Sequence, residues 1–542
     1  MPQKFIVVTG GVLSGIGKGI FSASLARILK DSGVNVNVLK IDPYLNVDAG
    51  TMNPNQHGEV FVTEDGYEAD LDLGHYERFL GIDVSRKNNI TAGQIYLSVI
   101  QREREGKYLG STVQIVPHVT SEIKERIKSM PGDLLVIEIG GTVGDIEGEV
   151  FLEAVRELAF EVGRENFLFA HVTYVPYLRT TNEFKTKPTQ QSAQLLRKIG
   201  IHPDTIVVRT ESPIDANSLY KVALFSGVPR NMVINLPDSA NVYEVPNILH
   251  SLGLHKLVAE KLGLEIKDNF SWNFPKSFEL LKIAIVGKYL GTDDAYKSII
   301  ESVYLSGSQK PEIIDSQELE EMNDEQVKSY LDQFDALIIP GGFGRRGIEG
   351  KIKAIKYARE NKKPILGICL GMQLMAIEFA RNVGGLTGAN STEFDENTPY
   401  PIVNMMESQK KILNLGGTMR LGAQKTIIEK GTLLSKVYKG QEIVYERHRH
   451  RYEVDAEAFP QLFKKPGEEG YKLVISARSD FVEAVELEDH PFFVGIQFHP
   501  EYKTKVGEPH PLFKALVKVA GGREIWLIIT YTVNFPQIRM QK

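Results

Sequence analysis

Short apolar strand candidates alternate with amphipathic helix candidates along this chain of 542 residues, and the alternation occurs twice over. Such a pattern is typical of parallel sheets whose strands are connected by helical crossovers. A second series of strand candidates begins at residues 281–287. The pattern therefore predicts an α/β protein with two domains, each a mostly parallel sheet with helices on both faces. In the first half the strand candidates span residues 5–9, 36–41, 134–139, 167–174 and 205–208.

Residues 268–280 separate the two series, and their polar and proline-containing composition is that of a linker. This interpretation gives a first domain over residues 1–267 and a second over residues 281–524. Each is close to the roughly 250 residues expected when a chain is too long for one core. Residues 525–542 form an atypical tail with an uncharged, β-prone run. It fits an added edge strand, an oligomer contact or a sequence-end artefact without function.

Composition narrows the class of protein. The net charge of −6 argues against a general nucleic-acid binder, because such domains are usually basic. The single cysteine excludes an intramolecular disulfide framework and fits a reducing compartment. No apolar stretch approaches the roughly 20 residues that a membrane helix needs. We therefore expect a cytoplasmic protein without nucleic-acid or membrane partners.

That single cysteine, Cys369, lies where an apolar strand candidate turns through a glycine-framed corner into a helix candidate, within residues 363–373. A thiol at such a turn points away from the core, and the N-terminus of the following helix favours its thiolate. The same geometry exposes the serine of Gly-x-Ser-x-Gly hydrolases. On its own, a lone cysteine is more often a small buried apolar residue.

Two further stretches make a catalytic role the better interpretation. His499 follows the strand candidate at residues 492–496, and Glu501 follows two residues later, where a carboxylate can orient the imidazole. Residues 336–344 predict a buried strand that ends in a glycine turn, whose backbone N–H groups could bind an oxyanion. Together with Cys369, these stretches resemble the class I glutamine amidotransferases.

The resemblance implies a role for each residue. Cys369 would attack the glutamine side-chain amide, with His499 as base and Glu501 as the residue that orients it. The backbone N–H groups of Gly342 and Leu370 would form the oxyanion hole.

The first strand candidate runs into a glycine-rich loop at residues 10–20, which can wrap phosphates with backbone N–H groups and contribute Lys18. It departs from the standard G-x-x-x-x-G-K-[ST] signature: it is one residue longer, and Gly19 replaces the hydroxyl that would bind Mg²⁺. A bare structural turn is the alternative. The missing metal ligands must come from elsewhere, and Asp72 and Glu138 are the best candidates.

Other charged residues near these positions are open to two interpretations. We expect Glu68 and Asp70 to lie on a solvated acidic face. Lys40 and Asp42 end the second strand candidate, where Lys40 could stabilise a phosphoryl group in transfer and Asp42 could join the metal shell. A solvated strand end explains Lys40 and Asp42 equally well.

Six stretches of the first half are long and unusual in sequence: residues 10–20, 40–44, 56–62, 70–78, 140–147 and 185–190. They resemble the synthetase domain of the CTP synthase family, and with the glutaminase half the likeness extends to about residue 520. The resemblance implies ATP-dependent amination of UTP to CTP through a phosphorylated UTP intermediate, with ammonia released from glutamine and channelled between the sites. A departure is Gly15, where the family more often has a second serine.

The same resemblance implies the remaining site residues. It makes Asp72 and Glu138 the Mg²⁺ ligands. The ATP-binding residues would be Gly15, Ile16, Gly17, Lys18, Gly19 and Ile20. The UTP- and CTP-binding residues would be Ser14, Asp145, Ile146, Glu147, Lys185, Thr186, Lys187, Pro188, Thr189, Gln190 and Lys221. Glutamine would be held by Gln373, Glu393 and Arg451.

The family also implies regulation and assembly. GTP would be an allosteric activator, CTP a feedback inhibitor, and the protein a homotetramer that could stack into filaments. The stretches that resemble the activator site contain Tyr289, Lys297, Arg345, Arg346 and Arg420.

Two other functions remain open from the sequence. One is another glutamine-dependent, ATP-driven amide ligase acting on a cofactor precursor; residues 140–147 and 185–190 argue against it, because a carboxylate substrate needs no triphosphate clamp. The other is a non-catalytic, filament-forming scaffold, against which the intact Cys369, His499 and Lys18 argue.

Overall fold

The computed structural model describes residues 2–276, 278–290, 292–405 and 419–524, and the chain forms two compact units. The first unit comprises the chain up to residue 51 and residues 68–274; the second comprises residues 52–67 and the chain from residue 275 onward. The tail at 525–542 lies outside the described residues. In the ranges described, no helix is long and apolar enough to cross a membrane.

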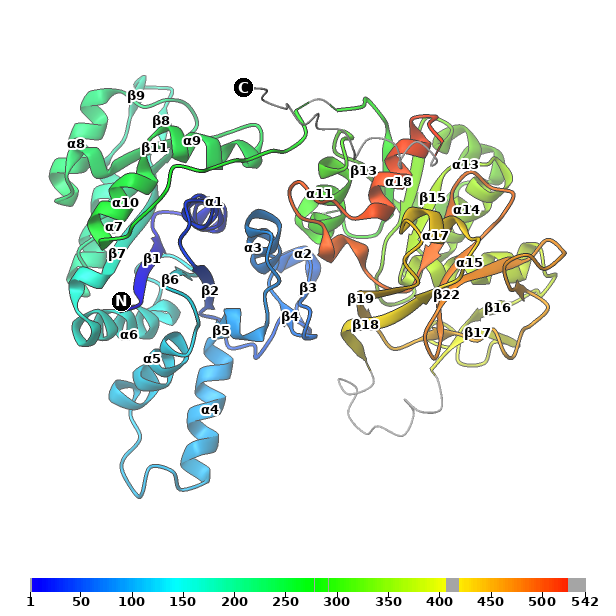
Figure 1. Ribbon diagram of the computed structural model, residues 1–542, viewed down its shortest axis with the longest axis horizontal. Helices are drawn as coiled ribbons and strands as arrows, with labels where there is room; N and C mark the ends of the chain where they lie inside the picture. The colour runs from blue at the N-terminus through cyan, green and yellow to red at the C-terminus, as the bar shows by residue number, and fades with distance from the viewer. Residues whose placement is uncertain (1, 277, 291, 406–418, 525–542) are drawn as a thin grey trace, which may run out of the picture. The chain divides into compact units, whose positions relative to one another are not determined.

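The first unit is built on a seven-stranded sheet, counted over its described residues, in which every strand pairing is parallel (Figure 1). Strands buried on both faces read as continuous apolar runs, which is why they could be predicted. In sheet order they are β11 (Val233–Pro237), β10 (Thr205–Thr210), β7 (Phe167–Tyr174), β1 (Lys4–Gly10), β6 (Leu134–Ile139), β2 (Val36–Asp42) and β5 (Asn89–Thr91).

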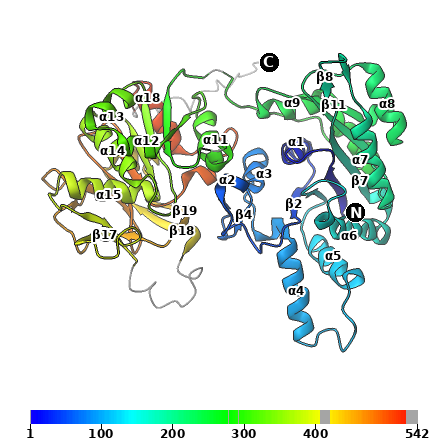
Figure 2. The ribbon, with the colours of Figure 1, turned by 180° about the vertical axis from the view of Figure 1, so that it is seen from behind.

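Helices cover both faces of this sheet. Phe5 and Val7 of β1 pack into one core with helices α4, α5 and α6, and Figures 1 and 2 show α4 and α5 side by side. Helix α1 packs with α3, α9 and α10. The helices are α1 (Lys18–Asp31), α3 (Asp72–Leu80), α4 (Ala92–Arg104), α5 (Thr120–Lys128), α6 (Glu149–Val162), α7 (Lys187–Lys198), α8 (Ala216–Ser226), α9 (Val245–Ser251) and α10 (Leu254–Leu262). Short strands are β4 (Glu68–Ala69), β8 (Tyr177–Leu178) and β9 (Glu183–Phe184).

The second unit has a larger sheet that is parallel in only one half. Its parallel strands are β13 (Glu312–Asp315), β12 (Ile283–Gly287), β14 (Ala336–Ile339), β15 (Ile365–Ile368) and β24 (Phe493–Ile496). The sheet continues antiparallel through β23 (Val482–Glu486), β22 (Leu473–Arg478), β18 (Arg420–Ile428) and β19 (Ile443–His450), with β21 (Phe463–Lys464) beside β22. The two-domain α/β prediction is confirmed, but the antiparallel half was not foreseen, because its strands need no helical crossovers.

Each face of this sheet has its own apolar core. Alternate residues of the parallel strands point to opposite faces: Leu337 and Ile339 join α12, α13, α14 and α15, whereas Ala336 and Ile338 join α11, α17 and α18. The helices are α2 (Pro54–His57), α11 (Lys297–Leu305), α12 (Ser316–Glu321), α13 (Asp324–Leu331), α14 (Ile348–Glu360), α15 (Leu370–Asn382), α17 (Leu433–Val437) and α18 (Pro511–Ala520). The remaining strands are β3 (Phe61–Val62), β16 (Ala389–Ser391), β17 (Tyr400–Asn404) and β20 (Glu453–Val454).

Residues 52–67 differ from the expected contiguous first domain over residues 1–267, because they pack within the second unit. The backbone N–H of Glu59 donates to Asp294 O at 2.8 Å. The Glu59 carboxylate accepts from the backbone N–H of Ser298 at 3.0 and 2.9 Å, in the first turn of α11, where a negative charge is favourable. These contacts could not be read from local sequence patterns.

Candidate active sites

Cys369 connects β15 to α15 with φ 53° and ψ −103°, a conformation that a non-glycine residue rarely adopts. Such backbone strain costs about 1–3 kcal/mol and is found mostly at functional sites. The surrounding glycines make the turn possible. A Cβ on Gly371 would overlap the carbonyl oxygen of Ile339, and one on Gly367 would lie 2.8 Å from the Gly371 carbonyl carbon. The chain therefore turns sharply at the thiol.

His499 is brought beside this turn because β24 pairs directly with β15. Its Nδ1 hydrogen-bonds to Glu501 Oε1 at 2.7 Å, and its Nε2 is buried without a hydrogen-bond partner among the described residues. Burial lowers the pKa of His499, but the carboxylate of Glu501 and the thiol of Cys369 outweigh it and raise the pKa to about 10. An imidazolium at this position would stabilise a neighbouring thiolate.

The glycine turn after β14 lies against both catalytic candidates. A Cβ on Gly341 would lie 3.0 Å from His499 Cε1 and 3.6 Å from Cys369 Cβ. Leu370 is the first residue of α15, so its N–H has no acceptor within the helix. A cavity of about 80 Å³ opens here, lined by Cys369, His499 and Gly342 together with Pro54 and Val60 from residues 52–67.

The candidate glutamine ligands are arranged around the same elbow. Gln373 donates from Nε2 to Gln497 Oε1 at 3.2 Å and to Tyr452 O at 2.9 Å. Glu393 accepts from the backbone N–H of Gly344 at 2.9 Å. Burial raises the pKa of Glu393, whereas Arg451 and other neighbours act to lower it. Arg451 has a buried Nε without a partner among the described residues.

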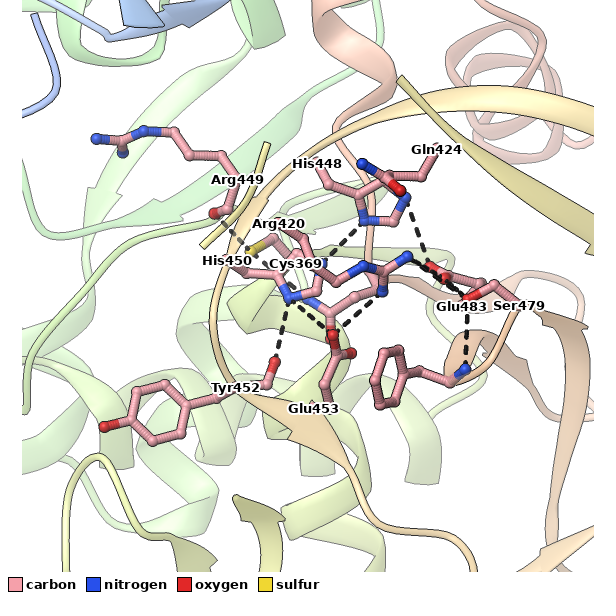
Figure 3. Close-up of polar contacts among 12 residues, drawn as sticks. Cys369, Arg420, Gln424, His448, Arg449, His450, Tyr452, Glu453, Ser479 and Glu483 are labelled. Carbon is pink, nitrogen blue, oxygen red and sulfur yellow. Dashed lines mark hydrogen bonds and ion pairs between the residues drawn. The ribbon is translucent and has the colours of Figure 1, made fainter. Parts of the chain in front are cut away.

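A buried polar network lies behind Cys369 (Figure 3). Arg420 binds Glu453 at 3.1 Å and Glu483 at 2.7 Å, and His448 Nδ1 contacts His450 Nε2 at 2.9 Å. Burial lowers the pKa of both histidines well below the ordinary value, so both are neutral. The guanidinium of Arg420 is thus already paired with two buried carboxylates.

In the first unit, the phosphate loop connects β1 to α1. Gly15 and Gly17 adopt left-handed conformations with φ 70° and 87°, and Lys18 begins the helix. Lys18 Nζ donates to Gly141 O at 2.7 Å, and burial lowers the pKa of Lys18. Gly141 belongs to the loop at residues 140–147, so two of the predicted nucleotide-binding stretches meet here.

Lys40 and the two candidate metal ligands form one cluster. Lys40 Nζ contacts Asp72 and lies 3.0 Å from Glu138 Oε1. A Cβ on Gly19 would lie 2.9 Å from Asp72 Oδ1 and 3.4 Å from Glu138 Oε2. These carboxylates therefore occupy the space that the hydroxyl residue of a standard phosphate loop would need.

The other acidic residues near this cluster are more enclosed than expected. Burial raises the pKa of Asp42 to about 6 and raises the pKa of Asp70 well above its ordinary value. Asp42 accepts from Asn89 Nδ2 at 2.8 Å. The expectation of a solvated face for Glu68 and Asp70 is wrong, because both are half-buried.

The predicted UTP-binding residues lie in four places: at Ser14, at residues 145–147, at residues 185–190, and at Lys221 on α8. Lys187 begins α7, where Thr189 and Gln190 are buried; Gln190 Nε2 donates to Thr186 Oγ1 at 3.0 Å. Val143 N donates to Gly10 O at 2.8 Å, which ties the loop of Asp145, Ile146 and Glu147 to the end of β1. The exposed members are Ser14, Asp145, Ile146, Glu147, Lys187 and Lys221, and Lys185 pairs with Glu183.

Two buried residues were missed by the sequence analysis. His171 bridges Thr9 Oγ1 and Ser192 Oγ, each at 2.8 Å, and burial together with Lys18 lowers its pKa to about 3. A lone polar residue inside an apolar strand was the available signal. Lys351 on α14 is fully buried and donates to Pro340 O at 3.3 Å. Nothing local separates it from Lys353 and Lys356, the half-buried lysines of the same helix.

The fold and these sites define the class: a glutamine amidotransferase unit joined to a nucleotide-dependent synthetase unit. The chain matches "CTP synthase N-terminus" over residues 4–264 and "Glutamine amidotransferase class-I" over residues 292–519. It is 87% identical to the CTP synthase of Thermosipho africanus, over 96% of this chain and 99% of the relative. It is 75% identical to that of Thermotoga maritima, over 96% of this chain and 100% of the relative. The chain belongs to the CTP synthase family.

A solved glutaminase domain of the Trypanosoma brucei CTPS, with bound acivicin, is 37% identical, with a TM-score of 0.41, over 45% of this chain and 95% of that domain. Family membership makes the chain a glutamine-hydrolysing ligase that aminates UTP to CTP with ATP and acts on small molecules. The alternatives of a different amide ligase and of a non-catalytic scaffold are not supported.

Proposed function

We propose that the second unit releases ammonia from glutamine through Cys369, His499 and Glu501. The strained thiol beside the His499–Glu501 pair is the observation that carries this assignment. The thiolate attacks the amide carbon, and the N–H groups of Gly342 and Leu370 stabilise the oxyanion. His499 gives its proton to the departing ammonia, and water then hydrolyses the thioester.

Glutamine is held by the two charged groups on its α-carbon, the ammonium and the carboxylate. Glu393 carries the negative charge that pairs with the ammonium group, Arg451 offers its guanidinium to the carboxylate, and Gln373 assists from α15. Because ammonium is not a nucleophile, NH₃ needs a route sheltered from water. The cavity at Cys369, with Pro54 and Val60 in its wall, is the proposed start of that route. Residues 52–67 continue at both ends into the chain of the first unit.

The first unit is proposed to activate UTP. ATP phosphates bind at Gly15, Ile16, Gly17, Lys18, Gly19 and Ile20. Lys40 stabilises the γ-phosphoryl group as it passes to the uracil 4-oxygen, after which ammonia displaces the phosphate. UTP, and CTP as inhibitor, bind at Ser14, Asp145, Ile146, Glu147, Lys185, Thr186, Lys187, Pro188, Thr189, Gln190 and Lys221.

Asp72 and Glu138 are proposed to hold Mg²⁺. The donor set fits, since both offer hard carboxylate oxygens beside the phosphate loop and Gly19 leaves them room. The ion would neutralise part of the negative charge of the phosphates. In this structure Lys40 forms ion pairs with both carboxylates.

We also propose that this chain shares the regulation and assembly of its family. GTP is proposed to activate glutamine hydrolysis near Tyr289, Lys297, Arg345 and Arg346; the Arg346 guanidinium lies 6.0 Å from the Tyr289 ring centre. We leave Arg420 out of this set, because it is paired with Glu453 and Glu483. A cytoplasmic homotetramer, able to form filaments, is the proposed assembly.

The test is absorbance-monitored formation of CTP from UTP, ATP and Mg²⁺, with either glutamine or ammonia. Cys369→Ala should lose the glutamine-dependent reaction and keep the ammonia-dependent one. Lys18→Met should still hydrolyse glutamine but form no CTP from either nitrogen source. Loss of both reactions in a folded Cys369→Ala protein would contradict the division of roles.

A further inference from the structure

Two histidines meet at the turn between α9 and α10, outside both candidate active sites. Gly253, with φ 69°, reverses the chain between them. The rings of His250 and His255 therefore stack, with centres 4.5 Å apart and planes 11° apart. Asp268, just after α10, reaches the same point: its Oδ1 lies 2.9 Å from His250 Nε2 and 4.0 Å from His255 Nε2.

His255 has an unsatisfied ring in this cluster. Its side chain is 1% exposed, and neither ring nitrogen has a hydrogen-bond partner among the described residues. Buried polar atoms without a partner are uncommon in proteins, so both ring nitrogens of His255 are available as ligand atoms. Because one of these nitrogens faces Asp268 across 4.0 Å, the gap is of the size that a bound cation would bridge.

Each of the three side chains offers one ligand atom. One donor atom from each lies within 4.8 Å of the others. Two imidazoles and a carboxylate suit Zn²⁺, Co²⁺ or Ni²⁺, whereas Mg²⁺ and Ca²⁺ prefer oxygen donors only.

Lys256 is the nearest competing cation. Its Nζ lies 2.9 Å from Asp268 Oδ2, on the other carboxylate oxygen. The Lys256 side chain is 61% exposed, so it can turn into solvent without leaving a buried charge behind. The lysine therefore holds the carboxylate in place and does not fill the position between the two histidines.

We propose that His250, His255 and Asp268 form a binding site for one borderline transition-metal dication of the Zn²⁺ class per chain. The ion is structural: it ties the chain just after α10 to the α9–α10 turn. A zinc ion bound by side chains from separate segments stabilises a fold because it links those segments.

The test is calorimetric titration of Zn²⁺ into the full chain carrying Cys369→Ala, in excess Mg²⁺. The Cys369→Ala substitution removes the catalytic thiolate as a competing ligand, and the excess Mg²⁺ occupies the carboxylates near the phosphate loop. We expect one Zn²⁺ per chain. Adding Asp268→Ala or His255→Gln should weaken binding by at least about tenfold, on the scale of lost metal-site interactions. Lys256→Gln, the matched control, should bind as tightly or more tightly.

Asp268→Ala is decisive, because this residue is half exposed and its loss leaves the core intact. Ammonia-dependent CTP formation should be unchanged in it, which separates this proposal from the proposed function. Co²⁺ should give visible ligand-field bands in the parent that disappear in Asp268→Ala. Absence of a Zn²⁺ site, or a site of equal affinity in Asp268→Ala and the parent, would overturn the proposal.

Discussion

Lys351→Met should stabilise the second unit while impairing glutamine hydrolysis. Burial, helped by Lys288 and opposed by Cys369, lowers the pKa of Lys351 from 10.5 to about 7. A change of one in a pKa is equivalent to about 1.4 kcal/mol. Protonating this amine in the folded chain therefore costs up to about 5 kcal/mol more than in the unfolded chain. Replacement of a buried charge by an apolar residue of similar size usually recovers about 1–4 kcal/mol.

The effect has a defined pH dependence. Because the pKa of Lys351 is lower in the folded than in the unfolded chain, the unfolded chain binds more protons between pH 7 and 10.5. The cost of burying the charge is therefore complete below about pH 7, and it disappears as the pH rises through that window. The stabilisation by methionine should be largest near pH 6. Near pH 10 only the lost hydrogen bond to Pro340 O remains, which costs about 1 kcal/mol.

Calorimetric melting of the full chain measures this. At about 2–4 °C per kcal/mol for a unit of this size, a recovery of about 1–4 kcal/mol raises the melting temperature by about 2–16 °C at pH 6, and the gain is absent at pH 10. Lys356→Met, at a half-buried position of the same helix where the lysine pairs with the exposed Asp324, should change melting little.

Activity should move in the opposite direction, since Lys351 holds the carbonyl of Pro340 next to the glycine turn. We expect glutamine turnover to fall about tenfold, less than the 10²–10³ of a lost oxyanion donor. Ammonia-dependent CTP formation should not change. A variant that melts lower at pH 6 than the parent would refute the reasoning.

Three further perturbations follow from contacts at the two sites. Gly371→Ala would place a methyl group on a carbonyl oxygen of β14, so glutamine hydrolysis should be abolished, as an ammonia-release assay would show. Glu501→Gln removes the main group that raises the pKa of His499 from 6.5 to about 10, so an NMR titration of that imidazole should move to lower pH and turnover should fall at least tenfold. Gly19→Ser should displace Asp72 and reduce CTP formation from both nitrogen sources by more than tenfold, while glutamine hydrolysis persists; equal activity would contradict the crowding argument.

The parts of the fold that the sequence predicted share a simple physical origin. Strands β1, β6 and β7 are buried on both faces, so they are continuous apolar runs that stand out from their surroundings. Strand β5 was missed because it has three residues, Asn89–Thr91, two of them polar. The antiparallel half of the second sheet depends on pairings between strands, which a single strand's pattern does not encode.

The residues of the candidate sites also fall into two groups: those that a local sequence pattern reveals and those that depend on tertiary contacts. The elbow at Cys369 and the phosphate loop were found because glycine spacing and a functional side chain occur within a few residues of each other. His171 and Lys351 were missed because their roles depend on partners brought by other elements. The packing of residues 52–67 in the second unit was missed for the same reason, and the roles of the site residues stay predictions.

The alternating Arg and His residues at the end of β19 illustrate why tertiary structure is needed to interpret a charge pattern. Successive side chains of a strand point to opposite faces, so the run separates into two functions. His448 and His450 lie on the buried side with the Arg420 network. On the other side Arg447 binds Glu64 at 2.7 Å, and Arg449 lines the cavity at the catalytic cysteine. This run of Arg and His residues is therefore a strand with a neutral, buried face that supports the backbone beside the thiol and a charged face directed toward the cavity and residues 52–67.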